Sequence, residues 1–135
     1  MERRNFIKSA ASLSAVTILR PGTVFGSKAN SAIRLGFIGC GNRGTADISS
    51  MSRNANVNIV AMADLFDYQL QTAKVKLDQL NAAKGFPAIR KSNIYQGSKA
   101  YLELMNNKDV DAVLISSPAY THPEFLEAAV AAGKH

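Results

Sequence analysis

Three glycines, Gly39, Gly41 and Gly44, have the spacing G-x-G-x-x-G in a segment that directly follows an apolar run. Where such a segment joins a strand to a helix, the glycines permit a tight turn, close approach of a pyrophosphate and close packing of the helix on the strand. Amide groups at the start of the helix hold the phosphates, and Asn42 lines the same loop. Arg43 either adds positive charge to this phosphate-binding site or remains solvated. The pattern predicts that these five residues bind a dinucleotide.

A carboxylate, Asp64, stands 20 residues beyond Gly44 and ends a second apolar run. A carboxylate at this place accepts hydrogen bonds from the hydroxyls of the adenosine ribose and repels a 2′-phosphate. Neither Leu65 nor Phe66 supplies the positive charge that NADP requires. Asp64 is therefore predicted to bind the cofactor and to select NAD over NADP.

Ser117 and Pro118 follow a later apolar run at its carboxyl end. In an open α/β sheet this edge carries the ligand, so both residues are predicted to contact the cofactor. His122 lies four residues past Pro118. It either faces the same crevice or serves as a capping or surface residue at the start of a helix. Asp109 and Asp111 are interpreted as solvated turn charges, and no metal site is expected.

The elements that must position these groups alternate along the chain. Strands are predicted over residues 33–38, 57–63, 92–96 and 110–115. Helices are predicted over residues 45–53, 67–83, 98–106 and 124–132. The residues expected on the apolar faces of the first and third helices are Ile48, Met51, Tyr101, Leu102 and Met105. This alternation predicts the α/β class and a Rossmann-like, doubly wound parallel sheet.

The charge of the chain is concentrated at its start. The formal net charge is +6, and residues 1–34 hold six basic residues against one acidic residue, which leaves +1 for the rest. The later part therefore has no basic stripe of the kind that binds nucleic acid, and no nucleic-acid partner is expected. Cys40 is the only cysteine, which excludes an internal disulfide. We interpret it as a small packing residue because no base is paired with it.

Residues 1–31 are predicted to be an export signal and linker. A short basic start is followed by an apolar run of small residues over 9–19 and then by Arg20-Pro21-Gly22. The segment Arg3-Arg4-Asn5-Phe6-Ile7-Lys8 resembles the twin-arginine signal, the alternative being a chance pair of arginines. The twin-arginine export machinery is the expected partner. The expected location is outside the cytoplasm, in the periplasm or anchored to the membrane.

Taken together, the glycine loop, Asp64 and three further segments resemble the Gfo/Idh/MocA oxidoreductase family. The further segments are Asp109-Val110-Asp111-Ala112-Val113, Ser117-Pro118-Ala119-Tyr120-Thr121-His122 and Ala132-Gly133-Lys134-His135. The resemblance implies an N-terminal dinucleotide-binding Rossmann domain over 32–135, truncated before its last strands. It also implies a Glu-Lys-Pro motif with a catalytic lysine beyond His135 and a C-terminal substrate domain, both absent here, so the catalytic residues are unknown.

Three functions are compatible with this resemblance. The first is the NAD-binding part of an exported oxidoreductase that transfers hydride between NAD and a sugar or polyol-like substrate, inactive as this chain alone and a homo-oligomer when complete. The second is an NAD-dependent glycoside hydrolase that removes terminal N-acetylgalactosamine, a branch that the leader and the Ser-Ser-Pro segment resemble. The third is a non-catalytic NAD-binding module.

Overall fold

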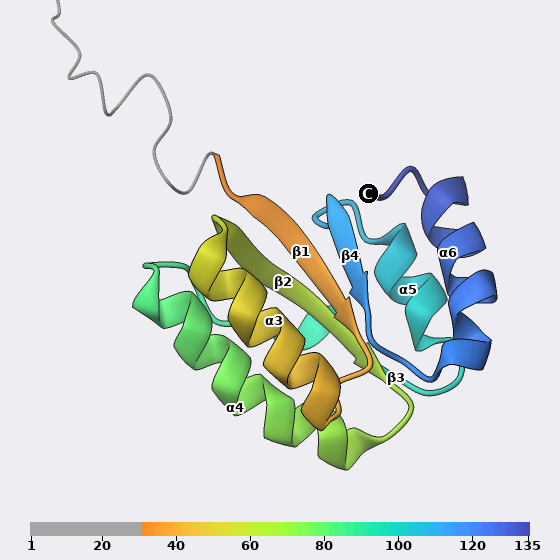
Figure 1. Ribbon diagram of the computed structural model, residues 1–135, viewed down its shortest axis with the longest axis horizontal. Coiled ribbons are helices and arrows are strands. Elements are labelled where there is room, and N and C mark those ends of the chain that lie inside the picture. The colour runs from red at the N-terminus through yellow and green to blue at the C-terminus, as the bar shows by residue number, and fades with distance from the viewer. Residues whose placement is uncertain (1–30) are drawn as a thin grey trace, which may run out of the picture.

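The computed structural model describes residues 31–135 (Figure 1), so the predicted export signal lies outside the described residues except for Ser31. The elements follow in the order β1 (Ile33–Ile38), α3 (Asn42–Asn54), β2 (Val57–Asp64), α4 (Asp67–Ala83), the 3-10 turn η1 (Lys91–Asn93), β3 (Ile94–Gln96), α5 (Ala100–Asn106), β4 (Ala112–Ile115), the 3-10 turn η2 (Ala119–Thr121) and α6 (His122–Ala131). Strand and helix alternate, as predicted. Within residues 31–135, no helix has the length and apolar character needed to cross a bilayer.

The four strands form one parallel sheet in the order β3-β2-β1-β4. This arrangement confirms the predicted Rossmann-like α/β fold. The central strand, β1, pairs with β2 on one side and with β4 on the other. The sheet therefore has its switch point at β1, the strand that leads directly into the glycine loop.

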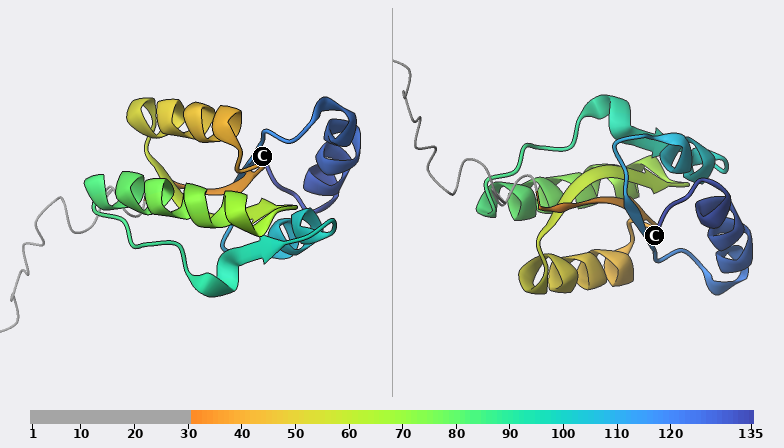
Figure 2. Two further views of the ribbon diagram at one scale, coloured as in Figure 1. Left: turned by 90° about the horizontal axis from the view of Figure 1, so that it is seen from below. Right: turned by 90° about the horizontal axis from the view of Figure 1, so that it is seen from above.

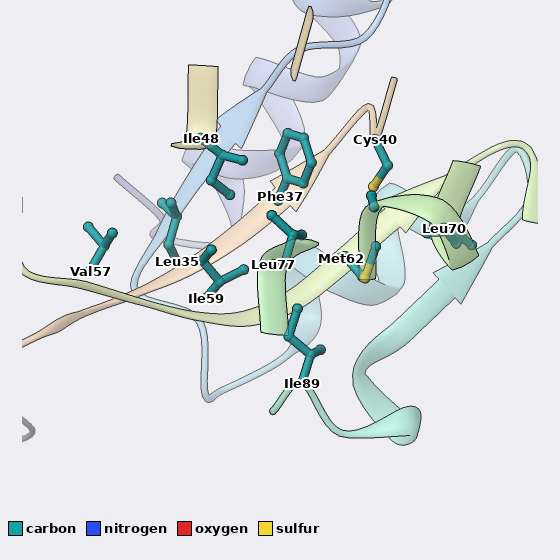
Figure 3. Packing of buried hydrophobic residues seen from close by; sticks show 11 residues of the cluster. Leu35, Phe37, Cys40, Ile48, Val57, Ile59, Met62, Leu70, Leu77 and Ile89 are labelled. Carbon is teal, nitrogen blue, oxygen red and sulfur yellow. The ribbon is translucent and has the colours of Figure 1, made fainter. Parts of the chain in front are cut away.

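Two hydrophobic cores lie on the two faces of the sheet. One joins β1 and β2 to α3 and α4, and its largest members include Phe37, Ile48, Ile59, Met62 and Leu77 (Figure 3). The other joins the sheet to α5 and α6 through Ile38, Tyr101, Leu104 and Ala129. Figure 2 shows α3 and α5 on opposite sides of the sheet. Because α3 belongs to the first core and α6 to the second, the β1–α3 and β4–α6 connections run to different faces of the sheet.

The rotation of two helices differs from the prediction. Ile48 is buried as expected, but Met51 is 36% exposed, and Ser49 and Ser52 face the interior instead. The inner stripe of α3 runs through residues 44, 48 and 52, because the helix approaches the sheet most closely at Gly44. In α5, Tyr101 and Met105 are buried as predicted, whereas Leu102 is exposed and its neighbour Leu104 is buried.

A buried side chain replaces a strand along part of one edge of β2. The short β3 pairs only with residues Met62–Asp64 and leaves the earlier part of that edge open. Asn81, 1% exposed within α4, accepts a hydrogen bond from the Ile59 amide (3.1 Å) and donates one to the Ile59 carbonyl (2.8 Å). The amide group thus supplies the pairing that a neighbouring strand would otherwise provide.

Candidate cofactor-binding site

A pocket of about 510 Å³ opens at the carboxyl ends of the strands. Five of the predicted site residues line it: Gly39, Gly41, Asp64, Ser117 and Pro118. The other four predicted residues, Asn42, Arg43, Gly44 and His122, lie beside the pocket without lining it. The glycine loop, the end of β2 and the loop after β4 therefore meet at one place, as the positions of these residues in the sequence predicted.

The three glycines of the loop have three different surroundings. Gly39 has φ +90°, and a Cβ there would lie 2.6 Å from the backbone of Ser116 and Ser117. A Cβ at Gly44 would lie 2.2 Å from the Gly39 carbonyl oxygen. At Gly41 a Cβ would meet only the Gln69 side chain, 3.9 Å away. Packing within the protein thus requires glycine at positions 39 and 44. Glycine at position 41 is not required by packing and leaves open space over the start of α3.

Asp64 contacts two backbone amides with its two carboxylate oxygens. Oδ2 accepts a hydrogen bond from the Cys40 amide at 2.7 Å, and Oδ1 accepts one from the Phe66 amide at 2.9 Å. The Cys40 thiol, 2% exposed, donates to the Ala63 carbonyl at 3.6 Å. Burial, together with the nearby Asp64 carboxylate, raises the pKa of the Cys40 thiol. Cys40 is therefore a packing residue with a protonated thiol, as interpreted from the sequence.

The charged residue of the loop points to solvent. The Arg43 side chain is 87% exposed and pairs with Asp47 one turn later, at 3.1 Å. Asn42 is the exposed first residue of α3, and Gly41 precedes it as the N-cap. Gly41 lines the pocket directly before the helix start, whose first amides have no partner within the helix, and Arg43 does not line the pocket.

The loop after β4 is held by its own side chains. The Ser117 and Thr121 hydroxyls lie 2.6 Å apart, and Thr121 Oγ1 donates to the Pro118 carbonyl at 2.7 Å. His122, exposed at the start of α6, donates from Nε2 to the Ser117 carbonyl at 2.8 Å. Its ring fixes the loop that carries Ser117 and Pro118 to the pocket.

Sequence reasoning did not identify the two apolar walls of the pocket. Leu65, Phe66 and Tyr68 line one side and are 54%, 52% and 63% exposed. On the other side, the rings of Tyr101 and Phe125 stack with centroids 4.2 Å apart. The only signal for the first wall was a group of large apolar residues directly after Asp64, where a solvated turn would ordinarily be polar.

The charges that line the pocket are negative. Asp64 and Glu124 are the charged residues among the described residues of its lining, which include no lysine or arginine. The Tyr101 hydroxyl donates a hydrogen bond to Glu124, and this bond raises the pKa of Tyr101. This hydrogen bond joins α5 to α6, the two helices that lie next to each other in Figure 1.

The aspartates before β4 are not only solvated turn charges. Asp111 accepts hydrogen bonds from two side-chain nitrogens of Arg34, Nε at 2.9 Å and Nη2 at 2.6 Å. The Arg34 guanidinium holds the pKa of Asp111 below its usual value. Asp109 lies 3.8 Å from the same guanidinium. The partner, Arg34, is the second residue of β1 and is distant in sequence, so the spacing around Asp111 gave no sign of it. Across residues 31–135, no three potential metal ligands come together.

A protein family described as an oxidoreductase family with an NAD-binding Rossmann fold matches residues 33–135. The chain belongs to the Gfo/Idh/MocA family. The described part of this family member is therefore an NAD(P)-binding Rossmann domain of the oxidoreductase type.

Two relatives in sequence are glycosyl hydrolase family 109 proteins. A glycosyl hydrolase family 109 protein of Stenotrophomonas maltophilia is 31% identical over 135 residues, covering 98% of this chain and 28% of the relative. Its counterpart in Solibacter usitatus is 32% identical over 108 residues, covering 80% and 24%. This member of the Gfo/Idh/MocA family thus spans about a quarter of the length of each.

Solved structures with the same fold include enzymes bound to either cofactor. A 3-ketoreductase of Actinomadura kijaniata in complex with NADP and TDP-benzene has 25% identity and a TM-score of 0.58, covering 77% of this chain and 27% of that one. A scyllo-inositol dehydrogenase of Lactobacillus casei with bound NAD(H) and scyllo-inositol has 24% identity and a TM-score of 0.58, covering 77% and 26%. The second likeness concerns the fold alone.

Proposed function

We propose that this chain is the NAD-binding part of an oxidoreductase that transfers hydride between NAD and a sugar or polyol-like substrate. The observation that carries the proposal is the place of Asp64, whose carboxylate lines the pocket beside the glycine loop. A carboxylate here favours the two ribose hydroxyls of NAD and repels the 2′-phosphate of NADP. The described pocket lining supplies no cation to offset that repulsion.

The residues present fit a dinucleotide along the whole pocket. Gly41 leaves the space in which a pyrophosphate reaches the amides at the start of α3. Leu65, Phe66 and Tyr68 offer the adenine ring an apolar wall next to Asp64. Ser117 and Pro118 lie on the side of β4, where the nicotinamide half belongs. NAD bound in this way supplies the site that accepts or returns a hydride.

The substrate class and the location rest on separate observations. Among proteins with this fold, the scyllo-inositol dehydrogenase acts on a cyclitol and the 3-ketoreductase on a ketone, by their names. Residues 3–8 resemble a twin-arginine signal, which we propose directs the protein to the periplasm or the outer face of the membrane. A reporter fused to residues 1–34 should be exported in a competent host, and an Arg3→Lys, Arg4→Lys version should stay in the cytoplasm.

A second function is favoured by the names of the sequence relatives. Glycosyl hydrolase family 109 proteins match nearly the whole chain at about 30% identity. In such an enzyme a bound NAD would supply a transient oxidation that is reversed within one turnover. The full-length gene product would then hydrolyse an aryl N-acetylgalactosaminide with no net formation of NADH, whereas a dehydrogenase accumulates NADH with a polyol.

Titration of NAD and NADP into the chain tests the cofactor assignment. We expect NAD to bind at least about tenfold more tightly, a difference of about 1.4 kcal/mol. Asp64→Ala should weaken NAD binding and bring the affinities for NAD and NADP closer together. The control Asp67→Asn removes a charge at an exposed position three residues later, at the start of α4, and should leave both affinities unchanged. Equal affinity for the two cofactors in the unmodified chain would contradict the proposal.

A further inference from the structure

We infer that Asp64 has a second role as a positioning residue that holds the glycine loop in its binding shape. Its carboxylate joins two separate segments, because Oδ2 accepts from the Cys40 amide at 2.7 Å and Oδ1 accepts from the Phe66 amide at 2.9 Å. Cys40 lies inside the glycine loop after β1, and Phe66 lies in the connection from β2 to α4. Every donor and acceptor belongs to the chain itself, so this link requires no ligand.

In the structure, the Cys40 amide donates its hydrogen bond to the Asp64 carboxylate. The other groups of the loop have different partners: the Gly39 amide donates to the Ala63 carbonyl at 3.0 Å, and Thr45 Oγ1 donates to the Cys40 carbonyl at 3.2 Å. Cys40 is 2% exposed, so its amide has little access to water while the loop is closed. Without Asp64 that amide is a buried donor without an acceptor, and the loop satisfies it by opening.

The arrangement requires a carboxylate and not merely a polar side chain. Two N–H groups converge on Asp64, one on each oxygen. An asparagine has one acceptor oxygen, and its NH2 group would face the second N–H, donor against donor. Each carboxylate oxygen also has a further lone pair, so the two amides do not consume the acceptors that the ribose hydroxyls need. The inference thus deepens the proposed function, since the same side chain serves both.

The thiol of Cys40 reports directly on this loop. It is the only thiol in the chain, it is buried, and its pKa is raised. A disulfide reagent such as dithionitrobenzoate therefore reacts with it only when the loop opens or the whole chain unfolds. The rate of labelling of the cofactor-free chain measures the opening equilibrium.

The experiment compares that rate in the full chain and in four variants: Asp64→Asn, Asp64→Ala, Asp64→Glu and the control Asp67→Asn. About 1 M salt reduces the screening length to about 3 Å and suppresses the direct effect of the lost charge on the thiol. We expect labelling to rise at least about tenfold in Asp64→Asn and Asp64→Ala, with a smaller change in the equilibrium of urea unfolding. Asp64→Glu keeps two acceptors and should recover much of the protection, and Asp67→Asn should label like the unmodified chain.

Two results would overturn the inference. One is an unchanged labelling rate in both Asp64→Asn and Asp64→Ala. The other is a rise that matches the change in global unfolding, or that also occurs in Asp67→Asn, because the effect would then be general destabilisation. Labelling is measured without NAD, so it separates this role from the cofactor assignment. A chain that fails to bind NAD but shows the expected labelling refutes the proposed function alone.

Discussion

Gly44→Ala should lower stability and Gly41→Ala should lower NAD affinity, although both glycines belong to one short motif. At Gly44 the new Cβ would lie 2.2 Å from the Gly39 carbonyl oxygen and 2.8 Å from Phe37 Cζ. Ordinary contacts need more than about 3.4 Å, so the start of α3 must move by about 1 Å away from the sheet. Overpacking of this kind costs about 1–3 kcal/mol, and the better helix propensity of alanine returns up to about 1 kcal/mol. Because the 2.2 Å contact is with a backbone oxygen and not with a flexible side chain, the cost lies at the upper end of its range, and Gly44→Ala should lose about 2 kcal/mol of unfolding free energy.

At Gly41 the same substitution has no steric cost within the protein. The nearest contact of a Cβ is Gln69 Nε2 at 3.9 Å, and the φ of −70° suits alanine. Loss of a favourable N-cap lowers stability, and reduced freedom of the unfolded chain raises it. The two effects largely cancel, so the unfolding free energy should change by less than about 0.5 kcal/mol. The methyl group instead occupies the approach to the α3 amides. Loss of one charge-assisted hydrogen bond, worth about 1.5–3 kcal/mol, weakens NAD binding by about 10- to 100-fold.

Urea denaturation followed by circular dichroism measures the stability, since the chain has no tryptophan to report by fluorescence. Calorimetric titration of NAD measures the affinity. The reasoning is refuted if Gly44→Ala is as stable as the unmodified chain, or if Gly41→Ala binds NAD normally. A Gly41→Ala chain that loses stability and affinity in equal measure would likewise show that the two glycines do not act separately.

Three further outcomes are expected. Asn81→Leu should cost about 3 kcal/mol in urea denaturation, because it leaves both backbone groups of Ile59 unpaired, while Gln79→Leu on the outer face of α4 should change stability by less than about 0.5 kcal/mol. Phe66→Ala should lower NAD affinity about tenfold by removing an aromatic contact with adenine, with little change in unfolding. The Tyr101 hydrogen bond should stabilise the fold fully below about pH 10, the ordinary tyrosine pKa, and be lost as the pH rises through its raised folded pKa. The difference in urea midpoint between the unmodified chain and Tyr101→Phe should accordingly shrink only in that alkaline range.

The strands and the residues at their carboxyl ends were predictable because their signals are local. A short apolar run before a glycine or an acidic residue is nearly sufficient to define a buried parallel strand, and the ends of such strands share one edge. The faces of the helices were less predictable. Met51 and Ile48 fit one helical stripe as well as Ser52 and Ile48 do, and only the close packing at Gly44 selects the second.

The polar links of the site were not predictable from the sequence, because each joins residues whose spacing has no meaning before folding. Asp64 was assigned to a ribose, and nothing near it indicated that its oxygens also hold the Cys40 and Phe66 amides. Tyr101 was assigned to the apolar face of a helix, and its hydroxyl bonds Glu124 of another helix. A side chain shows its hydrogen-bonding capacity in the sequence but not its partner.

The site itself follows from the path of the chain around β1. The connections after β1 and β2 lead to α3 and α4 on one face of the sheet, and the connection after β4 leads to α6 in the opposite core. These connections must therefore part at the carboxyl edge, and the opening between them is the pocket. The floor stays closed because Gly39 has no side chain to separate it from Ser116 and Ser117. His122 then fixes the Ser117 carbonyl, so the wall on the side of β4 is set by the protein. Gly39 and His122 thus act on geometry, and we propose that the Asp64 carboxylate and the α3 amides recognise the dinucleotide.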